Sequence, residues 1–162
     1  MFYNTDFPRG VGMDQYDLEI LALLRENARI THSDLSHHIH LSVPAVSERV
    51  RKLEHQGYIK KFTALISAKK FGKTLLFFST VTLEHPRHAD KFLHAVKYMP
   101  EILECHHVTG EGDYLLKIVT DDTAAMERII YALRCIEGVQ KTKTTVVLST
   151  VKEEPCIKIA GK

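Results

Sequence analysis

The positive charge of this sequence is concentrated in one short segment. Residues 43–61 carry five lysine or arginine side chains against two acidic ones, although the whole 162-residue chain has a net charge of only +2. The five basic residues are Arg49, Arg51, Lys52, Lys60 and Lys61. Lysine and arginine neutralise phosphates and donate hydrogen bonds to base edges, so such a segment can bind nucleic acid. A solvated helix face is the alternative interpretation of these charges.

Helices are expected to position these basic residues. Apolar residues recur at helical spacing from Met13 to about Tyr58. Asp14 can cap a first helix, and Asp17 follows three residues later, inside its first turn. The N-terminal part of the chain is therefore predicted to be helical throughout.

The next two helices predict a helix-turn-helix. Thr31 and Asp34 have the spacing of a capping box, and the helix that they open ends at Ile39. After a tight turn at residues 40–42, Ser42 is a good N-cap for the following helix. Two short helices joined by a three-residue turn, the second one basic, are typical of a DNA-binding helix-turn-helix.

The apolar stripe of the second of these helices indicates which side chains face outward. Val46, Val50 and Leu53 lie on one face, and the helix is expected to end near Gly57. The N-terminal half of such a helix contacts base edges. The residues expected to contact bases are Pro44, Ala45, Ser47, Glu48, Arg51 and Lys52. Ser42 and Arg49 are the other two residues of this helix region that we expect to bind DNA. Arg49 lies near the boundary between the inward and outward faces of the helix, so it is expected to contact a phosphate or to have a structural role.

The segment after Gly57 alternates like a strand. Residues 58–63 could form a wing beside the helix-turn-helix. Lys60 and Lys61 would then contact the phosphate backbone of DNA.

The second half of the chain predicts the element order β-α-β-β-α-β. Strands are expected at residues 75–84, 102–109, 114–120 and 139–151, and helices at 87–98 and from a cap at Thr123 to about Gly138. This order is the ferredoxin-like arrangement, with both helices on one face of the sheet. The other face would expose an apolar patch too large for a monomer, so we expect a homodimer.

A turn in this second half could bind a charged metabolite. Gly110-Glu111-Gly112-Asp113 offers exposed amide groups and the carboxylate of Asp113, which suit the two charges of a free amino acid. Glycine and aspartate also favour any hairpin turn, so a purely structural turn is the alternative.

Other chemistry finds less support in the sequence. Cys105, His106 and His107 are adjacent on an expected strand, so they point to alternate faces and cannot bind one ion together. We expect no metal and no cofactor. The three cysteines are widely spaced, which suits reduced thiols in the cytoplasm. No apolar run has membrane-spanning length and no secretory signal is visible, so no membrane partner is expected.

Four motifs occur in a fixed order along the chain. They are Asp14-x-x-Asp17-x-x-Ile20-Leu21, Asn27-Ala28-Arg29-Ile30-Thr31-x-x-Asp34-Leu35-Ser36, Leu41-Ser42-x-x-Ala45-Val46-x-x-Arg49-Val50-x-x-Leu53-Glu54-x-x-Gly57-x-Ile59 and Val108-Thr109-Gly110-x-x-Asp113-Tyr114-Leu115-Leu116-Lys117. In this combination, over about residues 13–154, the chain resembles the Lrp/AsnC (feast/famine) transcription regulators. Two positions depart from the pattern: His40 replaces the usual turn glycine, and Thr145 stands where some amino-acid-sensing relatives carry an aromatic residue.

The resemblance implies a function for each part. It implies an N-terminal domain that binds double-stranded DNA, a swapped linking strand at about residues 61–67, and a C-terminal domain that dimerises and often binds amino acids. It also implies that dimers assemble into octamers. The candidate effector-binding residues are Thr109, Gly110, Glu111, Gly112, Asp113, Tyr114, Thr145 and Val146.

These observations together predict an α+β chain: an N-terminal winged helix-turn-helix, a linking strand and a C-terminal ferredoxin-like βαββαβ domain. The predicted segments are an arm at 1–12, the DNA-binding domain at 13–60, the linking strand and hinge at 61–74, the effector-binding and oligomerisation domain at 75–154, and a tail at 155–162. We predict a cytoplasmic, sequence-specific regulator that is not an enzyme and that responds to an amino acid or related small metabolite. The alternative is an enzyme on the same two-domain frame, such as a haem-pathway decarboxylase, which resembles this family.

Overall fold

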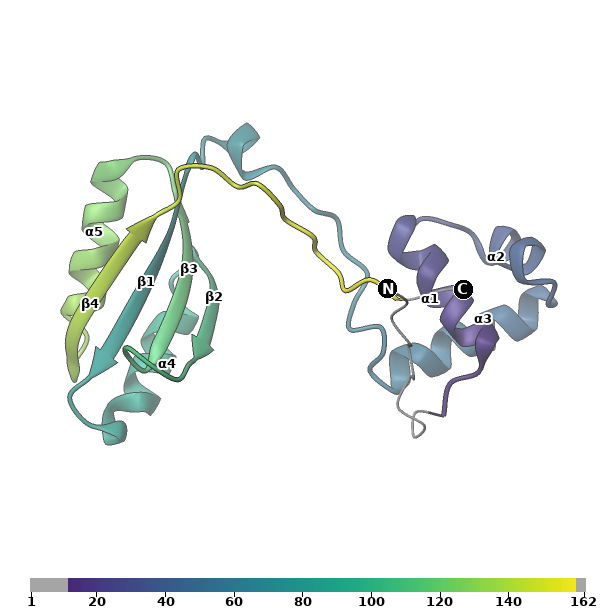
Figure 1. Ribbon diagram of the computed structural model, residues 1–162, viewed down its shortest axis with the longest axis horizontal. Coiled ribbons are helices and arrows are strands. Elements are labelled where there is room, and N and C mark those ends of the chain that lie inside the picture. Colours follow the sequence, from purple (N-terminus) through teal and green to yellow (C-terminus); the bar gives the residue numbers. More distant parts are fainter. Residues whose placement is uncertain (1–11, 160–162) are drawn as a thin grey trace, which may run out of the picture. The chain divides into compact units, whose positions relative to one another are not determined.

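The computed structural model describes residues 12–159 (Figure 1). These residues separate into two compact units, the first made of residues 12–64 and 153–159 and the second of residues 65–152. Most of the predicted arm, and the last three residues of the predicted tail, lie outside the described residues. No helix within the described range is long and apolar enough to cross a membrane.

The first unit contains the three expected helices. They are α1 (Gln15–Glu26), α2 (His32–Ile39) and α3 (Val43–His55). Asp14 and Asp17 form a reciprocal capping box on α1, and Thr31 and Asp34 form a second one on α2. The Ser42 side chain accepts a hydrogen bond from the backbone of α3, as its position predicts. The local capping signals therefore confirm where these helices begin.

A buried apolar cluster joins the three helices. Its members are Ile20, Leu35, Ile39, Val46, Val50 and Leu53, all at most 5% exposed. The turn between α2 and α3 depends on His40, which adopts a left-handed conformation with φ of 56°. Histidine tolerates this conformation better than most residues other than glycine. The turn thus forms without its usual glycine, and the apolar stripe of α3 is buried as expected.

The predicted wing strand is not formed by the described residues. Residues 60–67 have no regular secondary structure and pair with no other strand. A strand requires a second backbone to accept and donate its hydrogen bonds, and alternation of side chains supplies none. Residues 58–63, which could have formed a wing, therefore form no strand in the single chain.

The second unit has the expected ferredoxin-like order. Its elements are η1 (Ala68–Phe71), β1 (Leu75–Leu83), η2 (Pro86–His88), α4 (Ala89–Lys97), β2 (Ile102–His107), β3 (Tyr114–Thr120), α5 (Thr123–Arg134) and β4 (Val139–Val146). The four strands form an antiparallel sheet in the order β2-β3-β1-β4. Figure 1 shows α4 and α5 beside this sheet.

Both helices of the second unit cover the same face of the sheet. Phe77 of β1 and Leu116 of β3 are fully buried against Phe92 of α4 and Leu133 of α5. This packing confirms the expected two-layer arrangement.

The uncovered face is less apolar than expected. Residues opposite each other in an antiparallel pair point to the same face. Phe78 lies opposite Lys117 and Thr145, and Thr80 lies opposite Lys143. Lysine and threonine side chains therefore alternate with apolar ones on this face.

Several element boundaries differ from the expected ones. The helix α5 ends at Arg134 and not near Gly138, and α4 begins at Ala89 and not at residue 87. Three other differences have a local cause. β4 ends at Val146 instead of residue 151, because Val146 already lies opposite Phe77, close to the start of β1. α5 is capped by Asp122 instead of Thr123, since the Asp122 carboxylate accepts a hydrogen bond from the Ala125 amide. β2 ends two residues early, at His107, where its pairing with β3 ends.

Candidate DNA-binding and effector sites

The predicted base-contacting residues gather on one side of α3. Pro44, Glu48, Arg51 and Lys52 are exposed, whereas Ala45 and Ser47 are half-buried at the edges of this face. The helix keeps this orientation because its opposite side is buried in the first unit's core. Lys60 and Lys61 are exposed on the segment that follows α3. The structure thus gives the first unit a polar, partly basic surface centred on one helix.

Arg51 is held only loosely in this surface. Its Nη1 lies 3.6 Å from Glu48 Oε2, and both side chains are more than 70% exposed. Exposed ion pairs of this kind contribute little to stability. The Arg51 guanidinium can therefore exchange the carboxylate for a phosphate or a base edge at little cost.

Arg49 makes a different set of contacts. Its Nη1 lies 2.7 Å from both Asp14 Oδ2 and Asp17 Oδ1, and its guanidinium lies 5.3 Å from the centre of the Tyr16 ring. The hydrogen bond to Asp17 raises the pKa of Arg49. Although burial opposes the change, hydrogen bonds from the Asp17 amide and from Arg49 lower the pKa of Asp14. Of the two roles expected for Arg49, these contacts favour the structural one.

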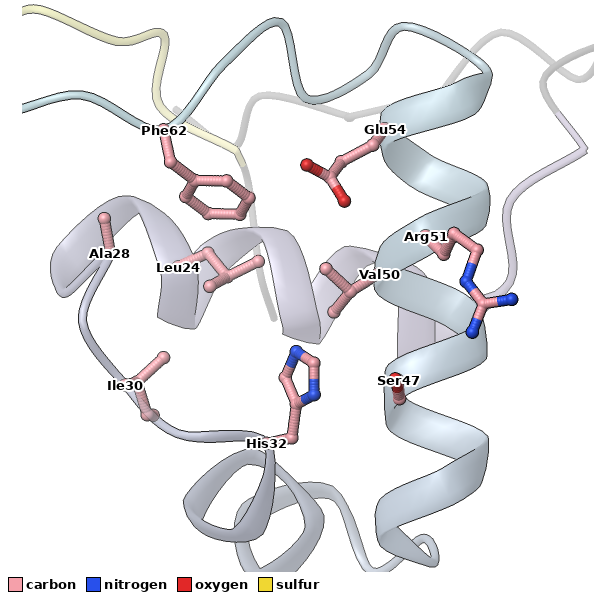
Figure 2. Close-up of a pocket in the computed structure, with 9 residues that line it drawn as sticks. All are labelled: Leu24, Ala28, Ile30, His32, Ser47, Val50, Arg51, Glu54 and Phe62. Carbon is pink, nitrogen blue, oxygen red and sulfur yellow. The ribbon is translucent and has the colours of Figure 1, made fainter.

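A pocket of about 320 Å³ opens beside α3. Figure 2 shows that α1, the loop before α2 and α3 surround it, and that His32 and Glu54 point into it. Its lining is completed by Leu24, Ala28, Ile30, Ser47, Val50, Arg51 and Phe62. Two predicted base-contacting residues thus border a pocket that sequence reasoning missed, because its residues come from three helices, the loop after α1 and the segment after α3, and share no spacing.

The turn between β2 and β3 is attached to the end of β1 through Asp113. The Asp113 amide donates a hydrogen bond to the Val81 carbonyl at 2.8 Å, and its Oδ2 accepts one from the Leu83 amide at 2.7 Å. These bonds give Asp113 the structural role that was the alternative to ligand binding. They engage one carboxylate oxygen and leave the second available to another partner.

Gly112 brings the same turn close to the uncovered face of the sheet. A Cβ atom at this position would lie 2.5 Å from Thr80 Cγ2, and the backbone φ is +89°. Next to it, Glu111 Oε2 lies 2.9 Å from Lys143 Nζ, and this hydrogen bond lowers the pKa of Glu111. A residue larger than glycine would therefore push the turn away from β1.

The sheet divides the predicted effector residues between its two faces. Thr145 lies opposite Phe78 on the uncovered face, with the Gly112 turn nearby, whereas Val146 lies opposite Phe77 on the covered face. Tyr114 is also on the covered face, with its ring 4.9 Å from that of Phe92. Thr109, Gly110 and Glu111 are exposed. The structure therefore brings the turn and Thr145 to one side and places Tyr114 and Val146 on the other.

The histidine-rich strand β2 alternates between the faces as predicted. Cys105 lies opposite Leu116 on the covered face, and His106 lies opposite Leu115 on the uncovered one. The hydrogen bond from His106 lowers the pKa of Glu104, which also pairs with Lys117. These contacts are typical of a charged surface, and His106 takes part in them as an ordinary surface side chain.

Family comparisons agree with this two-part organisation. A helix-turn-helix followed by a ferredoxin-like domain is an arrangement that DNA-binding regulators and enzymes can share, because a fold does not by itself determine function. Residues 13–60 match a family model described as winged helix-turn-helix DNA-binding, and residues 76–157 match the Lrp/AsnC ligand binding domain. The leucine-responsive regulatory protein of Escherichia coli strain K12 is 38% identical over 147 residues, which cover 89% of this chain and 90% of that protein. The chain therefore belongs to the Lrp/AsnC family of DNA-binding transcriptional regulators.

Solved structures of regulators have the same fold. A transcriptional regulator from Neisseria meningitidis, solved as a complex with L-Met, matches with a TM-score of 0.85 at 30% identity, covering 90% of this chain and 96% of that one. The leucine response regulatory protein of Mycobacterium tuberculosis matches with a TM-score of 0.80 at 28% identity, covering 91% and 100%. The α+β fold class is thus confirmed, and the alternative of a haem-pathway enzyme is not favoured.

Proposed function

We propose that this regulator recognises a specific DNA sequence through the outward face of α3 and responds to an amino acid or related metabolite through its second unit. The observation that carries the first part is the orientation of α3. Its apolar stripe is buried and Arg49 binds the start of α1, so Glu48, Arg51 and Lys52 remain outside. A helix held in this way can enter the major groove as one rigid body.

The regulator acts as a homodimer in this proposal. Leu65 and Ile66, which lie within the expected linking strand, and Phe71, which follows it, are each more than 70% exposed. On the sheet, Leu76, Phe78, Leu115 and Val119 lie on the face that neither helix covers. A second copy would bury these apolar side chains and place two recognition helices on the two half-sites of one operator. Further assembly to an octamer follows only from the resemblance to the family.

The effector binds at the turn between β2 and β3 in this proposal. The turn offers the exposed backbone of Thr109, Gly110 and Glu111, and Thr145 faces the same side of the sheet. Support also comes from the matched ligand-binding domain and from the L-Met complex of the Neisseria relative. Tyr114 and Val146, on the covered face, would act by supporting the strands beneath the site.

Selection of DNA tests this function directly. The full-length protein is incubated with sheared genomic DNA of its source organism, and the retained fragments are sequenced. We expect one sequence motif to be enriched, and we expect an amino acid to change the retention. Retention without any enriched motif would contradict sequence-specific recognition, and retention that none of the twenty amino acids alters would contradict the effector part alone.

A further inference from the structure

The chain contains a long interval without any acidic residue. Between Glu54 and Glu84 there is no aspartate or glutamate in 29 positions, although the interval contains five lysines. These are Lys60, Lys61, Lys69, Lys70 and Lys73. Lys60 and Lys61 lie in the first unit and are among the residues predicted to bind DNA. The other three lysines lie in the second unit, for which no contact with DNA has been proposed so far.

Lys69 and Lys70 project from a turn that is attached to the second unit. They lie in η1, which ends at Gly72 with a φ of +78°. Directly after it, Lys73 Nζ lies 3.0 Å from Asp121 Oδ1, and the Thr74 hydroxyl donates a hydrogen bond to the Asp121 carbonyl at 2.8 Å. These two contacts tie the end of the turn to the loop between β3 and α5. The two lysines are therefore presented from a defined position.

Neither lysine is neutralised by a neighbouring group. Lys69 and Lys70 are exposed, and neither forms an ion pair or side-chain hydrogen bond with any residue between 12 and 159. Other lysines of the same unit do have carboxylate partners, among them Lys73, Lys91 and Lys143. Two adjacent charges without counter-charges form a small surface that suits a polyanion.

We infer that Lys69 and Lys70 make a second, sequence-independent contact with the phosphate backbone of the DNA that α3 recognises. The inference rests on DNA as the regulator's partner and adds a contact from the second unit. Seven residues separate Lys61 from Lys69, and the eight Cα–Cα steps between the two lysines span at most about 29 Å when fully extended. This distance is roughly eight base pairs at ~3.4 Å each, so DNA next to the recognised sequence is within reach of both lysines.

The salt dependence of binding tests this contact. Lys69→Gln/Lys70→Gln in the full-length protein is compared with wild type on a 40-base-pair duplex, by fluorescence anisotropy between 0.05 and 0.3 M KCl. Each lost phosphate contact should reduce the slope of log K against log salt by about 0.9, so the pair should reduce it by about 1.8. At 0.1 M salt the affinity should fall at least about tenfold.

A control with the same loss of charge separates local contact from general attraction. Arg128→Gln/Arg134→Gln removes two exposed charges from α5 and, like the lysine variant, lowers the formal net charge from +2 to zero. We expect this control to retain most of the wild-type slope, and we expect Lys69→Arg/Lys70→Arg to retain all of it. If Lys69→Gln/Lys70→Gln and Arg128→Gln/Arg134→Gln have equal slopes, the inference is overturned.

Two further outcomes are distinguishable from that one. If the slope falls only because Lys69→Gln/Lys70→Gln dissociates into smaller species on size-exclusion chromatography, the lysines serve assembly and the inference is contradicted. If the wild type binds no duplex at all, DNA binding itself fails, and the inference fails with it.

Discussion

Asp17 of α1 and Arg49 of α3 are 32 positions apart in the sequence, yet Asp17 Oδ1 and Arg49 Nη1 are separated by only 2.7 Å. The Asp17 side chain is 3% exposed, so water cannot replace the arginine as its partner. The same guanidinium nitrogen contacts Asp14, the N-cap of α1. The start of the first helix therefore fixes the orientation of α3, the helix that we propose to contact DNA.

Removal of Arg49 should destabilise the first unit. Arg49→Ala leaves the buried Asp17 carboxylate without its counter-charge, although Asp17 Oδ2 still accepts a hydrogen bond from the Asp14 amide, and we expect the free energy of unfolding to fall by about 3–5 kcal/mol. Urea denaturation followed by circular dichroism measures this change. Arg51→Ala is the matched control, since its side chain is 73% exposed, and it should change stability by less than about 0.5 kcal/mol. Equal stability of the two variants would show that Arg49 does not hold α3.

The capping box of α2 should make the first unit sensitive to acid. Hydrogen bonds from the Thr31 hydroxyl and amide lower the pKa of Asp34 below 3.8. A carboxylate whose pKa is lower in the folded state stabilises the fold fully above its unfolded pKa, and this stabilisation is lost as the pH falls through the folded value. Asp34→Asn should therefore lose less stability than wild type between pH 5 and pH 3 in urea denaturation. Glu26→Gln, at an exposed position of α1, is the control, and the prediction fails if both variants follow the wild-type pH profile.

Gly112 should tolerate no side chain unless Thr80 is shortened. Gly112→Ala places a Cβ atom 2.5 Å from Thr80 Cγ2, whereas a Cβ atom at Gly110 would meet nothing within 4 Å. Both positions have a positive φ, so both alanine variants carry a backbone cost of roughly 1–2 kcal/mol. Thermal unfolding should show a lower Tm for Gly112→Ala than for Gly110→Ala, with partial recovery when Thr80→Ser removes the methyl group. If Gly112→Ala has the same Tm with and without Thr80→Ser, the close packing of the turn against Thr80 is contradicted.

Asp113 can be tested for both of its candidate roles with one pair of variants. Asp113→Ala removes the acceptor of the Leu83 amide hydrogen bond and should cost about 1–3 kcal/mol. Asp113→Asn keeps a carbonyl acceptor and should retain the wild-type Tm, but it loses the charge that faces a ligand's ammonium group. Calorimetric titration with the twenty amino acids should then show a loss of affinity of about 10- to 150-fold for the asparagine variant. Unchanged affinity would leave Asp113 with its structural role alone.

The sequence predicts the local features of the fold well. The capping residues of α1, α2 and α3 lie within three positions of the groups they bond, and His40 takes the left-handed conformation expected of the turn. The order of strands and helices in the second unit also follows from local periodicity. These features depend on neighbours in the chain, which a single sequence displays directly.

Features that depend on distant partners were not predictable in the same way. The pairing of Arg49 with Asp17 joins two helices whose separation in the sequence has no characteristic spacing. The end of β4 depends on where β1 begins, and the division of Thr145 and Tyr114 between two faces depends on strand register. The wing strand is missing because alternation indicates a strand without providing the second backbone that it needs.

Binding of an enriched duplex by Arg51→Ala/Lys52→Ala tests the central claim most directly. The duplex carries the motif retained by wild type, and gel shifts compare it with a scrambled sequence. Both residues are exposed on α3, so the fold should persist. Loss of a base contact should reduce the discrimination at one base pair of the motif by about 1–3 kcal/mol. Loss of a phosphate contact should lower the slope of log K against log salt by about 0.9. We predict a clear fall in affinity and in the preference for the motif, while Arg128→Ala behaves as wild type. Unchanged affinity and preference in the double variant would contradict recognition by this face of α3.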